Sequence, residues 1–345
     1  MKYGNSIAVR LINISAYTST ALTTVFTSIL LYAIATRTPE EMRHYRVLLL
    51  NYTIASLILS LLFSLCEPVP SSSLREVNRP ANDSGISYVI YGPIVYFIEP
   101  FYNQILSAIL VGVLLYTIMA IPLSFVFRYF AVRSKRYMEW FASLKVLFPI
   151  FMLNALIGSI AALFMCVGNM PKDEDDEDTT KISSWSHYYT YYGDNPNIPL
   201  FGNLIHLNSN VYYTILIFGI CLFISYATVI TFSMLTFKAI TSLRSISSKQ
   251  SLDAQRHFLV LLIFQSMLPA IFLVIPITVV VITIACGMLS TTINGTAIGL
   301  MFYETVFSVL IDLFGIVPYR KMLFSKFTSI ATLKERTAWS SVINH

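Results

Sequence analysis

The sequence predicts an all-α membrane protein, a single domain over residues 1–345 that folds as a bundle of seven transmembrane helices. Of its 345 residues, 56% are hydrophobic and 12% are charged, whereas an ordinary soluble domain has about 25% charged residues. Seven apolar stretches are each near or above the ~20 residues that a helix needs to cross a bilayer. We predict spans at 11–35, 47–65, 101–130, 146–167, 211–237, 258–286 and 297–317, followed by a cytoplasmic tail at 318–345.

The first span must be distinguished from a cleaved signal peptide, since Ala33-Ile34-Ala35 offers small residues at a cleavage spacing. The stretch before it is far longer than the hydrophobic region of about 7–15 residues in a signal peptide, so we expect an uncleaved span. The third, fourth and sixth spans contain prolines, which transmembrane helices tolerate because neighbouring helices satisfy the freed carbonyls. These prolines are Pro122, Pro149, Pro269 and Pro276.

The distribution of basic residues predicts the orientation. Of the 23 Lys and Arg residues, 17 lie in 36–46, 128–145, 238–256 and the tail from 318. Cytoplasmic loops are enriched in these residues, so the N-terminus is predicted outside and the C-terminus inside. The net charge of +5 then reflects membrane topology and gives no reason to expect a nucleic-acid partner. In the tail, 320–327 alternates basic and apolar residues, which predicts a short amphipathic helix on the inner leaflet.

Three of the four cysteines, Cys66, Cys166 and Cys286, fall at the predicted outer ends of spans, and Cys221 lies inside the fifth. None has the C-x-x-C spacing of a metal site. A pair at the outer ends is in the oxidising compartment in which disulfides form, and Cys66 with Cys166 is the favoured pair.

Two short motifs are glycosylation acceptors that the predicted topology places outside, at Asn82 and Asn294. A third, at Asn51, falls at the cytoplasmic face and is predicted to carry no glycan.

Four segments at successive membrane depths form a recognisable set. They are the loop and helix start from Thr38 to Asn51, the end of the third span at Phe127-Arg128-Tyr129, the stretch from Leu252 to Pro269, and Asp312 followed by Pro318-Tyr319-Arg320. Together they resemble the nematode serpentine chemoreceptors of the Str superfamily, which includes the str, srj, srh, sri and srd classes. The similarity extends from the first span to Arg320 and is nearest to str or srd.

The resemblance implies a G-protein-coupled receptor in the plasma membrane, at the sensory cilia of chemosensory neurons. It implies that a small odorant or water-soluble cue binds on the outside and that a heterotrimeric G protein binds inside. Coupling would involve Arg128, Tyr129 and Arg256. The conformational switch would involve Asp312, Pro318 and Tyr319.

Two departures from the general receptor pattern affect this switch. Phe127 precedes Arg128, so no carboxylate partner is available from the adjacent position, and the seventh span lacks the usual Asn-Pro-x-x-Tyr. Arg128 also has a structural interpretation as a positively charged anchor that extends to the interface.

Two acids lie in the predicted seventh span, and ionisable residues inside a membrane usually face the bundle interior or a water-filled cavity. Eight residues of helix place Glu304 and Asp312 about 80° apart and about 12 Å apart along the axis, so they cannot pair directly. Glu304, in the outer half, either lines a ligand cavity or bonds neighbouring helices in its neutral form. Asp312 belongs to the switch or to packing, and Gln265 is predicted to bond between helices.

Aromatic residues gather near the predicted outer ends of the spans. They could line a pocket for a small, mostly apolar molecule, and an interfacial aromatic belt explains them equally well. The candidates are Tyr102, Tyr212, Tyr213 and Tyr303, together with Phe97, Phe101 and Phe302.

Other classes of membrane protein have requirements that differ from those of a receptor. An odorant-gated channel of the insect type needs the N-terminus inside, and a retinal protein needs a Lys that 297–317 lacks. A transporter stays open, although the sequence has no internal repeat. No Ser, His and acidic residues gather at one depth, so we expect neither an enzyme nor a cofactor.

Overall fold

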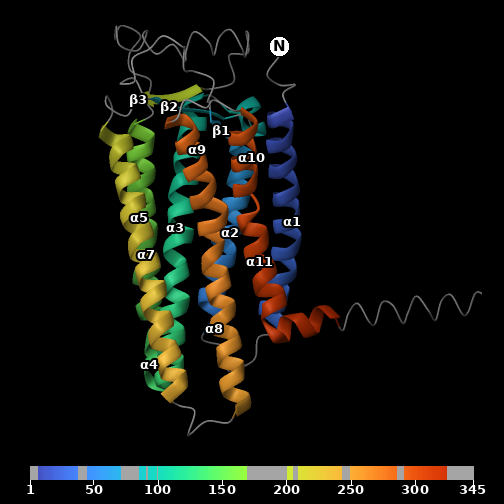
Figure 1. The fold of residues 1–345 in the computed structure, drawn as a ribbon, viewed down its shortest axis with the longest axis vertical. Helices are drawn as coiled ribbons and strands as arrows, with labels where there is room; N and C mark the ends of the chain where they lie inside the picture. Colours follow the sequence, from blue (N-terminus) through green and yellow to red (C-terminus); the bar gives the residue numbers. More distant parts are fainter. Residues whose placement is uncertain are drawn as a thin grey trace, which may run out of the picture.

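The computed structural model describes residues 7–37, 45–70, 85–90, 92–98, 100–168, 200–204, 209–242, 249–285 and 291–324. Seven helices in this part of the chain are long and apolar enough to cross a membrane. They run side by side, with a small sheet across the end of the bundle at which α1 begins (Figure 1). We call this end the sheet end, and the opposite end, where the last described helix lies, the tail end.

The first five spans are single helices, as predicted. Each extends the predicted range by one to five residues at an end, because a helix satisfies its own backbone hydrogen bonds and continues beyond the apolar stretch. The helices are α1 (Ile7–Arg37), α2 (Arg46–Cys66), α3 (Pro100–Arg133), α5 (Leu144–Gly168) and α7 (Ser209–Ser242). A short helix that was not predicted from the sequence, α4 (Lys135–Phe141), lies between α3 and α5 and has exposed Tyr137 and Trp140 side chains.

The sixth and seventh spans are interrupted helices. The sixth consists of α8 (Lys249–Pro269), a π-helical turn, η5 (Ala270–Val274), and α9 (Ile275–Ala285). It begins nine residues before the predicted start at 258, because the polar segment that precedes the apolar stretch is also helical. The seventh consists of α10 (Thr291–Met301) and α11 (Glu304–Gly315), which are separated by a break at Phe302 and Tyr303.

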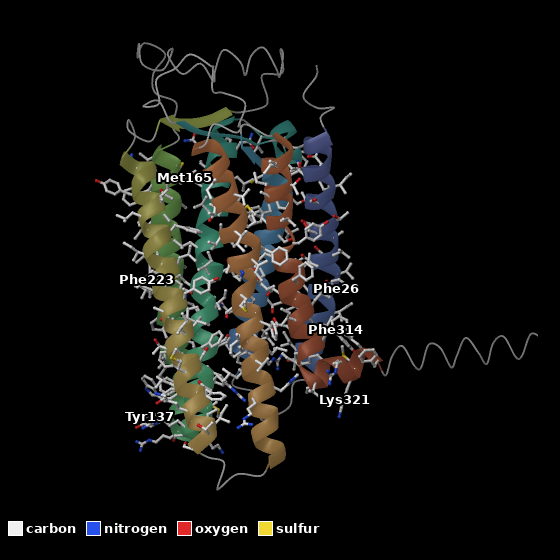
Figure 2. The ribbon with its side chains drawn as sticks, viewed as in Figure 1. Phe26, Tyr137, Met165, Phe223, Phe314 and Lys321 are labelled. Carbon is white, nitrogen blue, oxygen red and sulfur yellow. The ribbon has the colours of Figure 1, made fainter. Side chains whose placement is uncertain are left out.

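A short helix follows the seventh span, as predicted, over residues 317–324. It leaves the tail end sideways, and Lys321 lies on it (Figures 1 and 2). Its Arg320 and Lys321 side chains are exposed, whereas Tyr319 and Met322 are buried against the bundle. Residues 325–327 of the predicted helix lie outside the described residues.

The described residues are nearly all helical, and a small antiparallel sheet is the exception among them. Its strands are β1 (Pro68–Pro70), β2 (Gly85–Ile90) and β3 (Leu200–Leu204), in the order β1-β2-β3. Tyr88 pairs with Pro70 on one side and with Phe201 on the other. This sheet was not predicted from the sequence, because β2 and β3 are more than a hundred residues apart and no short hairpin turn joins them.

α3 lies at the centre of the bundle and packs against α2, α5, α7 and α8. It approaches α5 closely at Gly112 and Gly158, where a Cβ atom on either glycine would lie 2.7 Å from the carbonyl oxygen of the other. α1 packs at the periphery, against α2, α10 and α11. Large apolar side chains on α5 and α7 point away from the bundle, such as Phe223 (Figure 2), as expected of a surface that faces lipid.

The predicted disulfide between Cys66 and Cys166 is wrong for this structure, in which both residues are free cysteines. Cys66 ends α2 and is buried in the apolar cluster at the sheet end, whereas Cys166 is on α5. α3 packs between these two helices. Cysteines at a similar depth in the membrane were therefore not lateral neighbours. Cys286 lies outside the described residues.

Candidate functional site: a polar network inside the bundle

Three polar residues follow one another on one face of α11. Glu304, Ser308 and Asp312 are spaced four residues apart, so they lie on successive turns of the helix. Each is at most 5% exposed. Polar and ionisable groups inside a membrane are costly unless they have partners in the bundle, so the partners of these three define the site.

Tyr52 of α2 joins Glu304 and Ser308, the two of these residues nearer the sheet end. The Ser308 hydroxyl donates to the Tyr52 hydroxyl oxygen at 3.0 Å, and the Tyr52 hydroxyl donates to the Glu304 carboxylate. Both tyrosine and serine hydroxyls can donate and accept, so one hydroxyl can join two neighbours. Glu304 and Ser308 are therefore connected through a different helix.

Gln265 of α8 joins Ser308 and Asp312, the two of these residues nearer the tail end. Its side-chain N–H₂ donates to Asp312 Oδ2 at 3.2 Å and to Ser308 Oγ at 3.5 Å. The other carboxylate oxygen, Asp312 Oδ1, has no hydrogen-bond partner among the described residues. We call Tyr52, Gln265, Glu304, Ser308 and Asp312 the polar network. It connects α2, α8 and α11, and the prediction that Gln265 bonds between helices is confirmed.

Glu304 and Asp312 are thus linked although they do not pair directly. Glu304 begins α11, directly after the break in the seventh span, and its partner Tyr52 is only six residues from the start of α2. Glu304 therefore lies toward the middle of the bundle. From the sequence, Glu304 was predicted in the outer half of an unbroken span, because no sequence signal indicated the break.

A second cluster lies between the polar network and the tail end. Tyr45, just before α2, packs its ring on Phe127 with the centroids 5.6 Å apart and hydrogen-bonds Ser124. Burial is the main cause that raises the pKa of the Tyr45 hydroxyl, and the nearby carboxylate of Asp312 raises it further. Arg128 and the buried Tyr319 also lie close enough to affect Tyr45. We call Tyr45, Arg128, Asp312 and Tyr319 the Tyr45 cluster.

The Tyr45 cluster brings together three residues that the resemblance assigned to coupling and switching: Arg128, Asp312 and Tyr319. Asp312 belongs to both groups, so the polar network and the Tyr45 cluster are continuous from Glu304 to Arg128. Pro318 is half-buried at the start of the last helix, directly before Tyr319.

The other two candidate coupling residues lie elsewhere. Tyr129 packs its ring edge-on against Phe232 of α7, with the centroids 5.6 Å apart. Its hydroxyl accepts a hydrogen bond from Arg133 at 2.8 Å. Arg256 is half-buried on the tail-end part of α8. Both residues lie near the tail end but outside the polar network.

The predicted ligand-binding tyrosines whose side chains are described, Tyr102, Tyr213 and Tyr303, have different surroundings. Tyr102 of α3 is 55% exposed, and Tyr213 of α7 is 46% exposed and packs on Phe164. Tyr303 lies at the break in the seventh span, with its hydroxyl 3.1 Å from Thr18 Oγ1 of α1. The side chains of Tyr212 and Phe101, like that of the glycosylation candidate Asn294, lie outside the described residues, as does all of Asn82.

The other two aromatic candidates differ sharply in exposure. Phe97 is exposed, whereas Phe302 is buried and packs edge-on against Phe63 of α2 at 5.4 Å. Phe302 is therefore part of the apolar core at the sheet end.

The break in the seventh span is held against α1 on both sides. On the sheet-end side of the break, a Cβ atom on Gly299 would lie 3.2 Å from Ser15 Oγ, so α10 and α1 approach closely there. On the tail-end side, Thr23 Oγ1 lies 3.1 Å from Thr305 Oγ1. With the Tyr303–Thr18 contact, these pairs fix the position of Glu304 at the start of α11.

Sequence reasoning missed Tyr52, Ser308, Tyr45 and Glu67. Ser308 had a usable signal, since it lies four residues from each acid. Tyr52 and Tyr45 had none beyond a polar atom in or beside an apolar stretch. Glu67 is buried directly after α2 with a backbone φ of 40° and accepts a hydrogen bond from Tyr17, which no sequence pattern indicated.

The fold and the site define a multi-pass helical membrane protein with a hydrogen-bonded polar network in the tail-end half of its bundle. The sequence from α1 to the helix after α11 matches the model of a known family. The chain belongs to the serpentine type 7TM GPCR chemoreceptor Str family, whose model matches residues 12–324. A comparison with curated proteins gave no match. The resemblance to the Str superfamily is confirmed, and this is a family of receptors.

Proposed function

We propose that this protein is a chemosensory receptor that binds a small environmental molecule at the sheet end and activates a heterotrimeric G protein at the tail end. The observation that carries the proposal is the continuity of the polar network and the Tyr45 cluster. They connect four helices, α2, α3, α8 and α11, by hydrogen bonds and close charges. A ligand that shifts one of these helices changes the bonds of the others.

The orientation is part of the proposal. The described helix ends that border the basic segments 36–46, 128–145, 238–256 and the tail lie at the tail end, which is the charge pattern of a cytoplasmic face. The sheet end then faces the outside, at the plasma membrane and, for a chemoreceptor, at a sensory cilium. The odorant or water-soluble cue reaches the bundle from the sheet end.

Within this proposal Glu304 is the link between ligand and switch. It is the member of the polar network nearest the sheet end, and the break in the seventh span directly precedes it. Arg128 is the corresponding element at the tail end, where a G protein would bind. Tyr129, Arg256 and Pro318 lie around that face, and Tyr102, Tyr213 and Tyr303 lie toward the ligand side.

Two experiments test the proposal. An epitope at the N-terminus should be detected on intact cells, and one at the C-terminus only after permeabilisation. At least one of Asn82 and Asn294 should carry a glycan, and Asn51 none. Cells that express the protein should then give a second-messenger response to a member of a panel of volatile and water-soluble compounds. The reverse topology would exclude the receptor and favour a channel.

A transporter is the second candidate, because buried acids in a hydrogen-bonded series also form proton paths in transporters. The two acids of the polar network are the observation that favours it. Proteoliposomes decide between the candidates. A transporter changes the pH of the vesicle lumen or accumulates a solute there without any G protein. A receptor leaves the gradient unchanged and responds only when a G protein is present.

A further inference from the structure

The sixth span is interrupted by a wide turn between α8 and α9. The N–H of Ile275 donates to the carbonyl of Ala270, five residues back, which is π-helical spacing instead of the four of an α-helix. Pro269 directly precedes the turn. Since proline has no N–H, it cannot donate to the carbonyl of Gln265 as a helix requires.

The side chain of Tyr226, on α7, contacts the backbone at the start of this wide turn. The Tyr226 hydroxyl donates to the carbonyl oxygen of Ser266 at 3.2 Å, and its oxygen accepts a hydrogen bond from the backbone N–H of Ala270. In a regular α-helix those two backbone groups, four residues apart, bond each other. A side chain inserted into the backbone ladder is one of the established causes of a helix kink.

The part of α7 that carries Tyr226 is held in place. The neighbouring Ser225 is buried, and its hydroxyl donates to the carbonyl of Ile118 of α3 at 3.0 Å. Because α3 is the central helix, this bond anchors the turn of α7 from which Tyr226 extends. The Tyr226 hydroxyl can donate one hydrogen bond and accept another at the same time.

We propose that Tyr226 is a positioning residue of the sixth span, whose hydroxyl holds the wide turn and thereby sets the rotation of α9 relative to α8. One extra residue in a turn rotates everything beyond it by about 100°, the angle of a single helical residue. α9 packs against α10, and Phe272 in the wide turn stacks on Phe307 of α11 with the centroids 5.0 Å apart. The hydroxyl therefore determines which face of the sixth span meets the seventh.

The wide turn and Tyr226 lie between the two ends of the bundle. On the tail-end side of the wide turn, α8 carries Gln265 of the polar network. On the sheet-end side, α9 extends to the face where the ligand is proposed to bind. The structural role of Tyr226 is independent of the proposed function, and its effect on signalling rests on that function.

Hydrogen exchange of the full-length protein in nanodiscs tests the structural role without ligand or G protein. In Tyr226→Phe, the amides of 266–275 should change their exchange rates severalfold relative to the wild type. They become faster if the turn frays and slower if it closes into a regular helix, and either change requires that the hydroxyl held it. Tyr116→Phe is the matched control, because it deletes a hydroxyl that bonds the side chain of Asn51, at 2.7 Å, and no backbone of the sixth span.

Unchanged exchange at 266–275 in Tyr226→Phe would overturn the proposal, and so would an equal change in both variants, which indicates general loosening. The signalling role is read separately, from basal and agonist-induced second messenger at equal surface expression. A change in Tyr226→Phe that is absent from Tyr116→Phe supports it. Altered exchange with wild-type signalling would support the structural role of Tyr226 and overturn its role in signalling.

Discussion

Tyr52→Phe is the most informative change in the polar network, because it deletes one oxygen atom and leaves the ring in place. That oxygen accepts from Ser308 at 3.0 Å and donates to Glu304, so two interhelical hydrogen bonds are lost and two buried groups lose a partner. Interhelical hydrogen bonds in membranes contribute on average about 0.6 kcal/mol and at most about 1.7 kcal/mol each.

The loss of both bonds therefore amounts to about 1–3 kcal/mol, which corresponds to a shift of roughly 5- to 150-fold in an equilibrium between two states. If the network forms in only one state of the receptor, that shift appears in basal signalling or in agonist potency. The direction identifies the state: increased basal signalling means that the bonds hold the resting state.

The assay measures second-messenger production against agonist concentration at matched surface expression, with thermal unfolding in detergent as a separate measure of stability. Tyr116→Phe is the control, since it deletes the same atom from a bond between α3 and α2 that is outside the network. Both variants should lose stability, Tyr52→Phe more because it breaks two bonds and Tyr116→Phe one, and only Tyr52→Phe should change signalling. If the two variants signal alike, the network is structural packing and the reasoning fails.

The remaining predictions concern each end of the molecule. Glu304→Gln keeps the shape of the side chain and should shift potency about ten- to a hundredfold for a cationic or polar agonist, but little for an apolar one; identical curves for both agonists would remove Glu304 from ligand recognition. Arg128→Ala should abolish or strongly weaken signalling while ligand binding and surface expression persist, and unchanged signalling would reduce Arg128 to a topology anchor. Glu67, just outside the second span, has a pKa raised by burial from 4.5 to about 7, against the lowering effect of the hydrogen bond from Tyr17. Because its folded pKa is above its unfolded value, the stability it contributes is full below about pH 4.5 and is lost as the pH rises through about 7. Thermal unfolding midpoints should fall over this window in the wild type and fall less in Glu67→Gln; parallel profiles would contradict the assignment.

Most of the bundle was predictable because a bilayer imposes a minimum length on apolar helices and requires them to satisfy their own backbone. The ends of the spans were less predictable, since hydropathy marks the apolar stretch and not the helix: α8 begins at Lys249, in a polar segment. The sheet could not be predicted, because more than a hundred residues separate the end of β2 at Ile90 from the start of β3 at Leu200.

The candidate site was predictable only where one helix carries the signal. Glu304 and Asp312 stood out as acids in an apolar span, and their separation correctly excluded a direct pair. Their partners Tyr52 and Gln265 come from α2 and α8, so only tertiary packing brings them together. The same reason explains the failure of the Cys66–Cys166 pair, for which depth in the membrane was known but lateral position was not.

The central claim is that the polar network acts as one unit between Glu304 and the tail end. A double-mutant cycle tests it most directly, with Glu304→Gln, Gln265→Leu and the combined variant measured for basal signalling and agonist potency. Among the described residues, Glu304 and Gln265 share no direct hydrogen bond, and the bonds that connect them run through Tyr52 and Ser308. We predict that the effects are non-additive by about 0.5–3 kcal/mol, as for residues in one network, whereas additivity within about 0.3–0.5 kcal/mol would show two independent sites and contradict the account.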